Sequence, residues 1–182
     1  MTRIFDILFS FLGLVFLSPI LMVLIIIGYF DTGSPIFRQE RVGKSMKPFR
    51  LMKFRSMHVN APSVATHLAS ASSITPFGSF LRKSKLDELP QLWNVFVGDM
   101  SLVGPRPNLF NQEELILERN SRGVYAVRPG ITGLAQINKI DMSTPKLLAE
   151  TDGKMIQELN TLGYFKYIFL TVRRQTNVDF WL

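Results

Sequence analysis

Cysteine is absent from this 182-residue chain, and histidine occurs only twice, at His58 and His67. Without cysteine, neither a disulfide framework nor a thiolate metal site can form. A zinc site takes three or four ligands, so we interpret the two histidines as ordinary polar loop residues. Internal repeats and low-complexity tracts are also missing. These absences exclude disulfide-stapled, zinc-binding and repeat architectures.

Acidic residues are scarce as well, since 14 Asp and Glu stand against 21 Lys and Arg and leave a formal net charge of +7. Such an excess favours an anionic partner, which is nucleic acid, a lipid surface or a phosphorylated substrate. An apolar N-terminal segment takes up about thirty residues. The remaining length leaves room for one compact domain.

Charge is missing altogether from residues 7–30, a run of 24 residues. As one helix this run would be about 36 Å long, enough to cross a bilayer core of about 30 Å. The run is too long for a cleaved signal peptide, and no small-x-small cleavage site follows it. Ser18 and Pro19 stand at its midpoint, where proline bends or breaks a helix. The proline alone favours a kinked single span, and the alternative is a re-entrant helix-break-helix that returns to the same face.

Basic residues dominate the stretch that follows, which places this side of the membrane in the cytoplasm. They are Arg38, Arg41, Lys44, Lys47, Arg50, Lys53 and Arg55. Alternation within residues 35–39 and 49–55 predicts two short strands with a turn at 42–45 between them. We interpret the basic side chains as a solvated strand face, one that also suits anionic lipid headgroups.

Further along the chain, residues 61–73 predict a loop or weak helix, and helices are expected over residues 109–119, 144–162 and 164–172. The last of these is aromatic and amphipathic, so membrane-interface and core positions are both open for it. The expected fold class is α/β (α+β): a mostly helical, membrane-associated single domain with a short β element.

Asp87 and Glu88 form an acidic pair just after Arg82. A helix should begin near Leu86, because Pro90 is tolerated only within a first turn. This places both carboxylates at the positive end of the helix dipole, which favours their ionised forms. The apolar stripe of this helix indicates core positions for Trp93 and Phe96 rather than a ligand platform. It consists of Leu89, Leu92, Trp93 and Phe96.

A rigid turn holds Arg106 between Pro105 and Pro107, close in sequence to the acidic pair. An acidic pair at a helix start is usually only surface charge, and a Gly-Pro-Arg-Pro turn is usually only a stiff turn. Together they indicate phosphoryl chemistry, because a carboxylate can carry a phosphoryl group covalently and cations offset the charge on its oxygens.

A collinear set of motifs resembles the bacterial sugar transferase family, the monotopic polyprenol-phosphate phosphoglycosyl transferases, and in particular its small members. The motifs are Arg3-Ile4-Phe5-Asp6, Ser18-Pro19, Leu86-Asp87-Glu88-Leu89-Pro90-Gln91-Leu92, Gly98-Asp99-Met100-Ser101, Gly104-Pro105-Arg106-Pro107 and Arg128-Pro129-Gly130-Ile131-Thr132-Gly133. The resemblance implies that residues 1–31 form a re-entrant membrane helix broken at Ser18-Pro19, which replaces the kinked span. Residues 32–182 would then be a cytoplasmic catalytic domain with interfacial amphipathic helices.

The same resemblance implies a reaction at the cytoplasmic face of the bacterial inner membrane, the first membrane step of glycoconjugate synthesis. Asp87 would attack the β-phosphate of a UDP-sugar, release UMP and carry the phosphosugar, and undecaprenyl phosphate would then accept it. Mg²⁺ would bind at Asp87, and Glu88 would support the metal or proton chemistry. Arg82, Arg106 and Arg128 would bind phosphate or nucleotide. The implied partners are the UDP-sugar, undecaprenyl phosphate and membrane lipid, and no nucleic acid.

One departure from the family pattern is Lys139-Ile140, where relatives often have Gly-Arg, and it bears on sugar specificity rather than on the core reaction. The alternative function is a non-enzymatic, membrane-anchored basic module that binds lipid or nucleic acid. That alternative explains the net charge but gives no reason for Asp87 and Glu88 beside the Arg106 turn.

Overall fold

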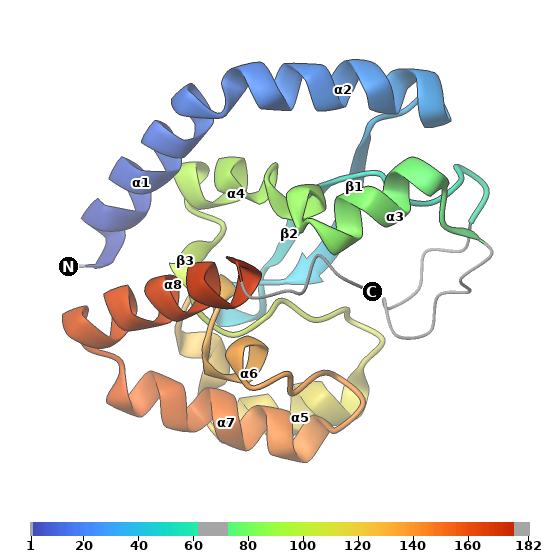
Figure 1. Cartoon of the computed structure of the whole chain (residues 1–182). Helices are drawn as coiled ribbons and strands as arrows, with labels where there is room; N and C mark the ends of the chain where they lie inside the picture. The colour runs from blue at the N-terminus through green and yellow to red at the C-terminus, as the bar shows by residue number, and fades with distance from the viewer. Residues whose placement is uncertain (1, 62–72, 177–182) are drawn as a thin grey trace.

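The computed structural model describes residues 2–61 and 73–176. The loop or weak helix expected at residues 61–73 lies almost entirely outside the described residues. The described part is mostly helical, with two short two-stranded sheets, and forms a single domain (Figure 1). This agrees with the expected mixture of helices and a short β element.

The N-terminal segment consists of two helices, α1 (Thr2–Phe16) and α2 (Ser18–Thr32), bent by 63° relative to each other (Figure 1). Pro19 lies in the first turn of α2, where its missing N–H costs no hydrogen bond. The Ser18 hydroxyl donates to the Val15 carbonyl at 2.7 Å across the break. The break expected at Ser18 and Pro19 is therefore confirmed. No single described helix is long and apolar enough to cross a membrane, whereas the bent pair together reaches that length and composition.

Strands β1 (Ile36–Val42) and β2 (Pro48–Phe54) form an antiparallel hairpin, as expected, and β1 ends three residues later than the alternation indicated. A short 3-10 turn, η1 (Lys44–Met46), lies at the tip. Phe49 and Leu51 of β2 are buried against Val95 and Met100. The segments that follow in the chain therefore pack against the hairpin.

Three short elements follow: α3 (Pro76–Lys83), the 3-10 turn η4 (Leu86–Glu88) and α4 (Gln91–Val97). The sequence-based prediction placed the acidic pair in the first turn of an α-helix, and this was wrong. The pair lies in η4, and α4 begins only at Gln91, with Pro90 as its N-cap residue. Proline has no N–H and clashes with the preceding turn, so the chain interrupts the helix there.

The expected core positions of Trp93 and Phe96 were also wrong. Trp93 is 48% exposed, and the buried residues of α4 are Gln91, Asn94 and Val95. Phe96 is half-buried and lies beside Phe11 of α1, with their ring centroids 6.1 Å apart. Phe96 therefore packs against α1 rather than in the interior of the domain.

A parallel pair of short strands, β3 (Ser101–Val103) and β4 (Gly130–Thr132), was not expected from the sequence. The Gly104 N–H donates to the Thr132 carbonyl, and the Gly130 N–H donates to the Pro105 carbonyl, each at 2.8 Å. A Cβ on Gly130 would lie 2.0 Å from the Gly104 nitrogen, so only glycine permits this approach. The contact fixes the start of the Arg106 turn.

The C-terminal half adds α5 (Glu113–Ser121), the 3-10 turn η5 (Val124–Ala126), α6 (Leu134–Ile137), α7 (Pro145–Glu158) and α8 (Thr161–Thr176). The three helices expected here exist with shifted ends. The first begins four residues later than expected, the second ends at Glu158, and the third is longer at both ends. Leu115 of α5 and Leu148 of α7 share a buried cluster that joins these two helices.

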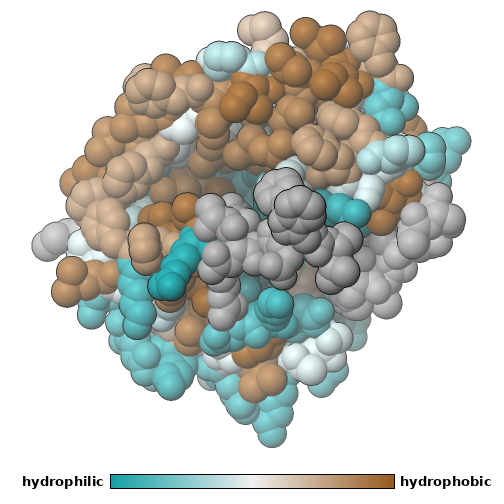
Figure 2. All heavy atoms as spheres, viewed as in Figure 1, coloured by the Kyte–Doolittle hydropathy of each residue, from teal (hydrophilic) through white to brown (hydrophobic). Residues whose placement is uncertain are grey.

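Large apolar side chains remain exposed along the N-terminal helices. Figure 2 shows them as a continuous brown region over α1 and α2 at the upper left and top. Phe11 is 50%, Phe16 75% and Phe30 84% exposed. Exposed apolar surface of this extent usually marks a binding surface for protein or membrane.

Candidate active site

The turn η4 presents Asp87 and Glu88 beside β2 and the Arg106 turn. Lys85 adopts a left-handed conformation, with φ of 58°, that reverses the chain between α3 and η4. Few non-glycine residues adopt this conformation, and such residues often lie at functional sites. The reversal brings the acidic pair back over the hairpin.

Glu88 is held between two cations. Its Oε1 atom accepts from Lys53 Nζ and from Arg106 Nη2, each at 2.9 Å. Burial opposes ionisation, but the charges of Arg106 and Lys53 outweigh it and hold the pKa of Glu88 well below its usual range. Glu88 is therefore a permanent carboxylate that fixes both cations in place.

Asp87 has a different environment. It is 8% exposed, and its carboxylate accepts no hydrogen bond from the described residues. Burial raises its pKa, although Lys53, Lys85 and Arg106 each act in the opposite direction. The helix-dipole argument, which favoured the ionised form, was wrong for Asp87, because the residue lies outside the helix and is desolvated. The site thus contains a carboxylate near cations but bound to none of them.

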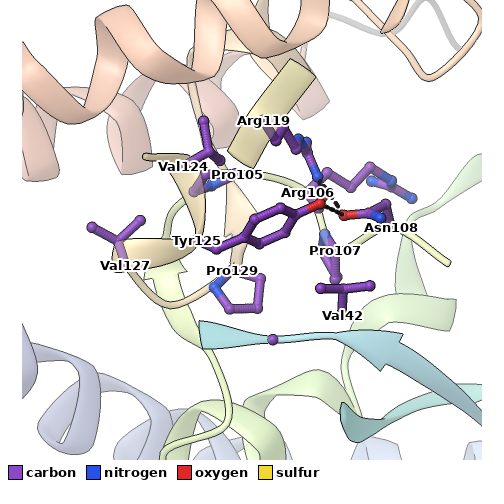
Figure 3. A pocket seen from close by; sticks show the side chains of 11 residues that line it. Val42, Pro105, Arg106, Pro107, Asn108, Arg119, Val124, Tyr125, Val127 and Pro129 are labelled. Carbon is purple, nitrogen blue, oxygen red and sulfur yellow. Dashed lines mark hydrogen bonds between the residues drawn. The ribbon is translucent and has the colours of Figure 1, made fainter. Parts of the chain in front are cut away.

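Arg106 is positioned through its backbone by a buried ion pair. Arg119 donates from Nη2 to Asp152 Oδ2 at 2.6 Å, and from Nη1 to the Arg106 carbonyl at 2.9 Å. Asn108 Oδ1 accepts a hydrogen bond from the same Nη1 atom at 2.9 Å and from the Tyr125 hydroxyl at 3.1 Å. Figure 3 shows these side chains beside Arg106. Together with three prolines and three valines, these side chains line a small pocket against the Arg106 turn (Figure 3).

The other two arginines named from the sequence make backbone or hydroxyl contacts. Arg82 donates from Nε to Ser56 Oγ at 2.8 Å, and Arg128 donates from Nε to the Gly98 carbonyl at 2.7 Å. Neither forms an ion pair with a described residue. The structure therefore brings Asp87, Glu88 and Arg106 together and leaves Arg82 and Arg128 outside the ion-paired cluster.

Lys53 is the site residue that sequence reasoning missed. It was grouped with a solvated strand face, yet only 18% of its side chain is exposed, and its ammonium pairs with Glu88. The two residues lie 35 positions apart, so no local pattern indicates the contact. We call the group of Lys53, Asp87, Glu88 and Arg106 the acid–base cluster.

Among the described residues, no group of three or more His, Asp and Glu side chains could hold a metal ion. Mg²⁺ does not need such a group, because it is commonly bound by one or two carboxylates together with substrate phosphates and water. The carboxylate of Asp87, which accepts no hydrogen bond from described residues, fits this mode. Glu88 is already occupied by its two cations.

Residues 1–177 match the sequence model of the family described as bacterial sugar transferase. A UDP-galactose-lipid carrier transferase of Erwinia amylovora is 40% identical over 156 residues, which cover 75% of this chain and 32% of that protein. A UDP-glucose:undecaprenyl-phosphate glucose-1-phosphate transferase of Klebsiella pneumoniae is 44% identical over 141 residues, which cover 75% of this chain and 30% of that protein.

An uncharacterized sugar transferase of Bacillus subtilis, EpsL, is 38% identical over 173 residues, which cover 94% of this chain and 85% of that protein. The chain thus spans about a third of the two larger relatives and most of this smaller one.

Proposed function

Because this chain belongs to the bacterial sugar transferase family, we propose that it transfers a sugar 1-phosphate from a UDP-sugar to undecaprenyl phosphate. Relatives that match it are named as transferases of this kind. The structural observation that carries the proposal is the acid–base cluster. Asp87 lies there as a buried carboxylate that accepts no hydrogen bond from a described residue, next to cations that a second carboxylate holds in place.

In the proposed first step, a carboxylate oxygen of ionised Asp87 forms a bond to the β-phosphorus of the UDP-sugar. The bond from that phosphorus to the bridging oxygen breaks, and UMP leaves with the electron pair. In the second step, a phosphate oxygen of undecaprenyl phosphate attacks the same phosphorus, and the Asp87 carboxylate is released. A covalent intermediate of this kind divides the transfer into two displacements.

Lys53 and Arg106 would offset the negative charge on the phosphoryl oxygens during both displacements. Their pairing with Glu88 at 2.9 Å supports this role, because it orients the two cations before substrate binds. Glu88 thereby acts on the substrate through the cations. Arg82 and Arg128 remain candidates for binding the phosphates or the nucleotide.

Mg²⁺ is part of the proposal, with Asp87 and the diphosphate oxygens as its ligands. When bound, it offsets the like charges of the carboxylate and the diphosphate as they meet.

A membrane position for the chain is also proposed, with the N-terminal pair as a re-entrant helix on the cytoplasmic face of the bacterial inner membrane. Both ends of the pair are tied to the same domain. At one end, Asp6 Oδ1 accepts from the Ser101 hydroxyl at 3.0 Å and the Tyr164 hydroxyl at 2.8 Å. At the other end, Asp31 Oδ2 accepts from the Thr75 hydroxyl at 2.7 Å. Because both of its ends bind the same domain, the N-terminal pair is expected to enter the membrane and return to the same membrane face.

The test is reconstitution with UDP-sugars labelled in the sugar, undecaprenyl phosphate and Mg²⁺, followed by organic extraction. We expect label in the lipid phase with one or more UDP-sugars, and its loss when a chelator removes Mg²⁺. Without lipid acceptor, the enzyme should release up to about one UMP per active site in a burst, the kinetic sign of a covalent intermediate. A module that only binds lipid or nucleic acid would transfer no label from any UDP-sugar.

A further inference from the structure

Arg41, near the end of β1, is a buried cation without a counter-ion. It is 8% exposed and forms no ion pair with a described residue. Its Nη1 donates to the Pro107 carbonyl at 3.4 Å, a long contact, and its Nη2 donates to the Gln39 side chain. Its Nε is buried and has no hydrogen-bond partner among residues 2–61 and 73–176. Buried charges in folded proteins are normally paired, so this one stands out.

The charge that acts on Arg41 is another cation. Burial and the nearby Arg106 lower the pKa of Arg41 to about 10. The carboxylates of Asp87 and Glu88 act instead on Lys53 and Arg106. The Arg106 guanidinium is therefore close enough to interact with the carboxylates of Asp87 and Glu88 and also with Arg41.

The backbone holds this arrangement. The Val42 N–H, next to Arg41 in β1, donates to the Asn108 carbonyl at 2.9 Å and so ties the strand to the Arg106 turn. Asn108 is itself fixed by Arg119, which also binds the Arg106 carbonyl. Arg41 and Arg106 are thus presented as two neighbouring cations on a rigid support, an arrangement that suits a ligand with neighbouring negative charges.

We propose that Arg41 binds the α-phosphate of the UDP-sugar, the phosphate that leaves as UMP. This inference rests on the proposed function, which places the β-phosphate at Asp87. A diphosphate with its β-phosphate in the acid–base cluster and its α-phosphate beside Arg41 lets Arg106 lie between the two groups. The ligand then supplies the anion that the described residues do not provide for Arg41.

A purely structural role for Arg41 predicts a different outcome on mutation. If the main role of Arg41 were to stabilise the contact between β1 and the Pro107 carbonyl, Arg41→Met would lower the melting temperature. If it is an unpaired cation kept for a ligand, Arg41→Met removes a buried uncompensated charge, and the apoprotein should melt at or above the wild-type temperature. A lower melting temperature for Arg41→Met would overturn the proposal.

The direct test is calorimetric binding of UMP to purified full-length protein in detergent. Compared with wild type, Arg41→Met should bind UMP at least about tenfold more weakly, because a charge-assisted hydrogen bond is lost. Arg41→Lys keeps the charge and should recover part of the affinity. Arg38→Met is the matched control, since Arg38 is an exposed arginine on the same strand, and its UMP affinity should be unchanged.

The two half-reactions give a second readout. Arg41→Met should slow the UMP burst, in which negative charge develops on the α-phosphate, by about tenfold or more. It should leave unchanged the transfer of phosphosugar from preloaded enzyme to undecaprenyl phosphate, because UMP has already left. Equal slowing of both steps, or wild-type UMP affinity in Arg41→Met, would overturn the role of Arg41. A wild-type enzyme that neither binds UMP nor transfers label would reject the proposed function as well.

Discussion

Buried charged residues in this protein differ in how they are compensated. Arg119 and Asp152 pair almost completely out of solvent and serve the structure. Glu88 pairs with two cations, whereas Asp87 accepts no hydrogen bond from described residues, and its pKa is raised by burial. Incomplete compensation of a buried group destabilises the fold and is typical of functional sites. The uncompensated carboxylate is therefore where we expect the chemistry.

Asp87→Asn should abolish turnover while leaving the fold largely intact. The amide keeps the size of the side chain but cannot form the aspartyl phosphate. Lipid-linked label and the UMP burst would both be measured, together with the melting temperature. Asp141→Asn, the same substitution at an exposed aspartate, is the control and should retain full activity. Full turnover by a well-folded Asp87→Asn variant would contradict the assignment of the nucleophile.

Lys53→Met should lower kcat/KM for the UDP-sugar by about 100-fold, the usual cost of removing one group that stabilises transition-state charge. Glu88 would still be paired with Arg106, so the cluster should survive the change. Steady-state kinetics on the variant test this, with Lys83→Met as the control because Lys83 is an exposed lysine of α3. Similar kinetics for the two variants would place Lys53 outside the reaction.

Helix α1 is joined to the domain by polar contacts as well as by apolar packing. Arg3 donates from Nη1 to the Val95 carbonyl at 2.6 Å and from Nη2 to the Phe96 carbonyl at 2.8 Å, at the end of α4. Asp6, 2% exposed, accepts from the Leu102 N–H of β3 at 2.9 Å. Because β3 leads directly into the Arg106 turn, α1 supports the strand that positions the site.

Tyr164→Phe should reduce the free energy of unfolding by about 1–3 kcal/mol, the usual contribution of a hydrogen bond to a charged group. The lost bond is the one from the buried Tyr164 hydroxyl of α8 to the Asp6 carboxylate of α1. Denaturant unfolding in mild detergent measures the change. Tyr167→Phe on the same helix is the control, because no hydrogen bond from its hydroxyl to a described residue is found. Equal effects of the two substitutions would argue against the Asp6 anchor.

At the scale of the whole molecule, the bent N-terminal pair forms an apolar arc over a more polar domain (Figure 2). Part of the pair still packs inward, since Leu24 of α2 is buried with Phe54 and Leu81. The pair is thus fastened to the domain at both ends and near the middle of α2, and its outer surface stays exposed, as the proposed membrane position requires. Such an arrangement would keep the acid–base cluster close to the membrane surface, where a lipid phosphate is found.

Thr2→Cys and Thr32→Cys, introduced singly, should both resist an impermeant thiol reagent in intact spheroplasts and react once the cells are opened. The reason is that a re-entrant pair keeps both its ends in the cytoplasm. The chain contains no other cysteine, so any labelling reports only the introduced site. Labelling of Thr2→Cys in intact spheroplasts would show instead that the segment spans the membrane.

The sequence by itself determined the features that depend on neighbouring residues. Pro19 dictates the helix break, because the missing N–H and the ring act within one turn. The alternation around Phe49 gives the hairpin, and Thr144 with Pro145 marks the start of α7. The acidic pair and the Arg106 turn were recognisable as motifs for the same reason.

Only the tertiary structure decided the features that depend on distant partners. Glu88 meets Lys53 across 35 positions, and Arg41 meets the Pro107 carbonyl across 66. Trp93 is 48% exposed and Phe96 packs against Phe11 of α1, and helical periodicity alone does not determine which surface a helix packs against. The pKa of Asp87 is raised by burial, which is a property of everything packed around it. Periodicity and turn chemistry act over a few residues, whereas burial and charge pairing are set only when the whole chain folds.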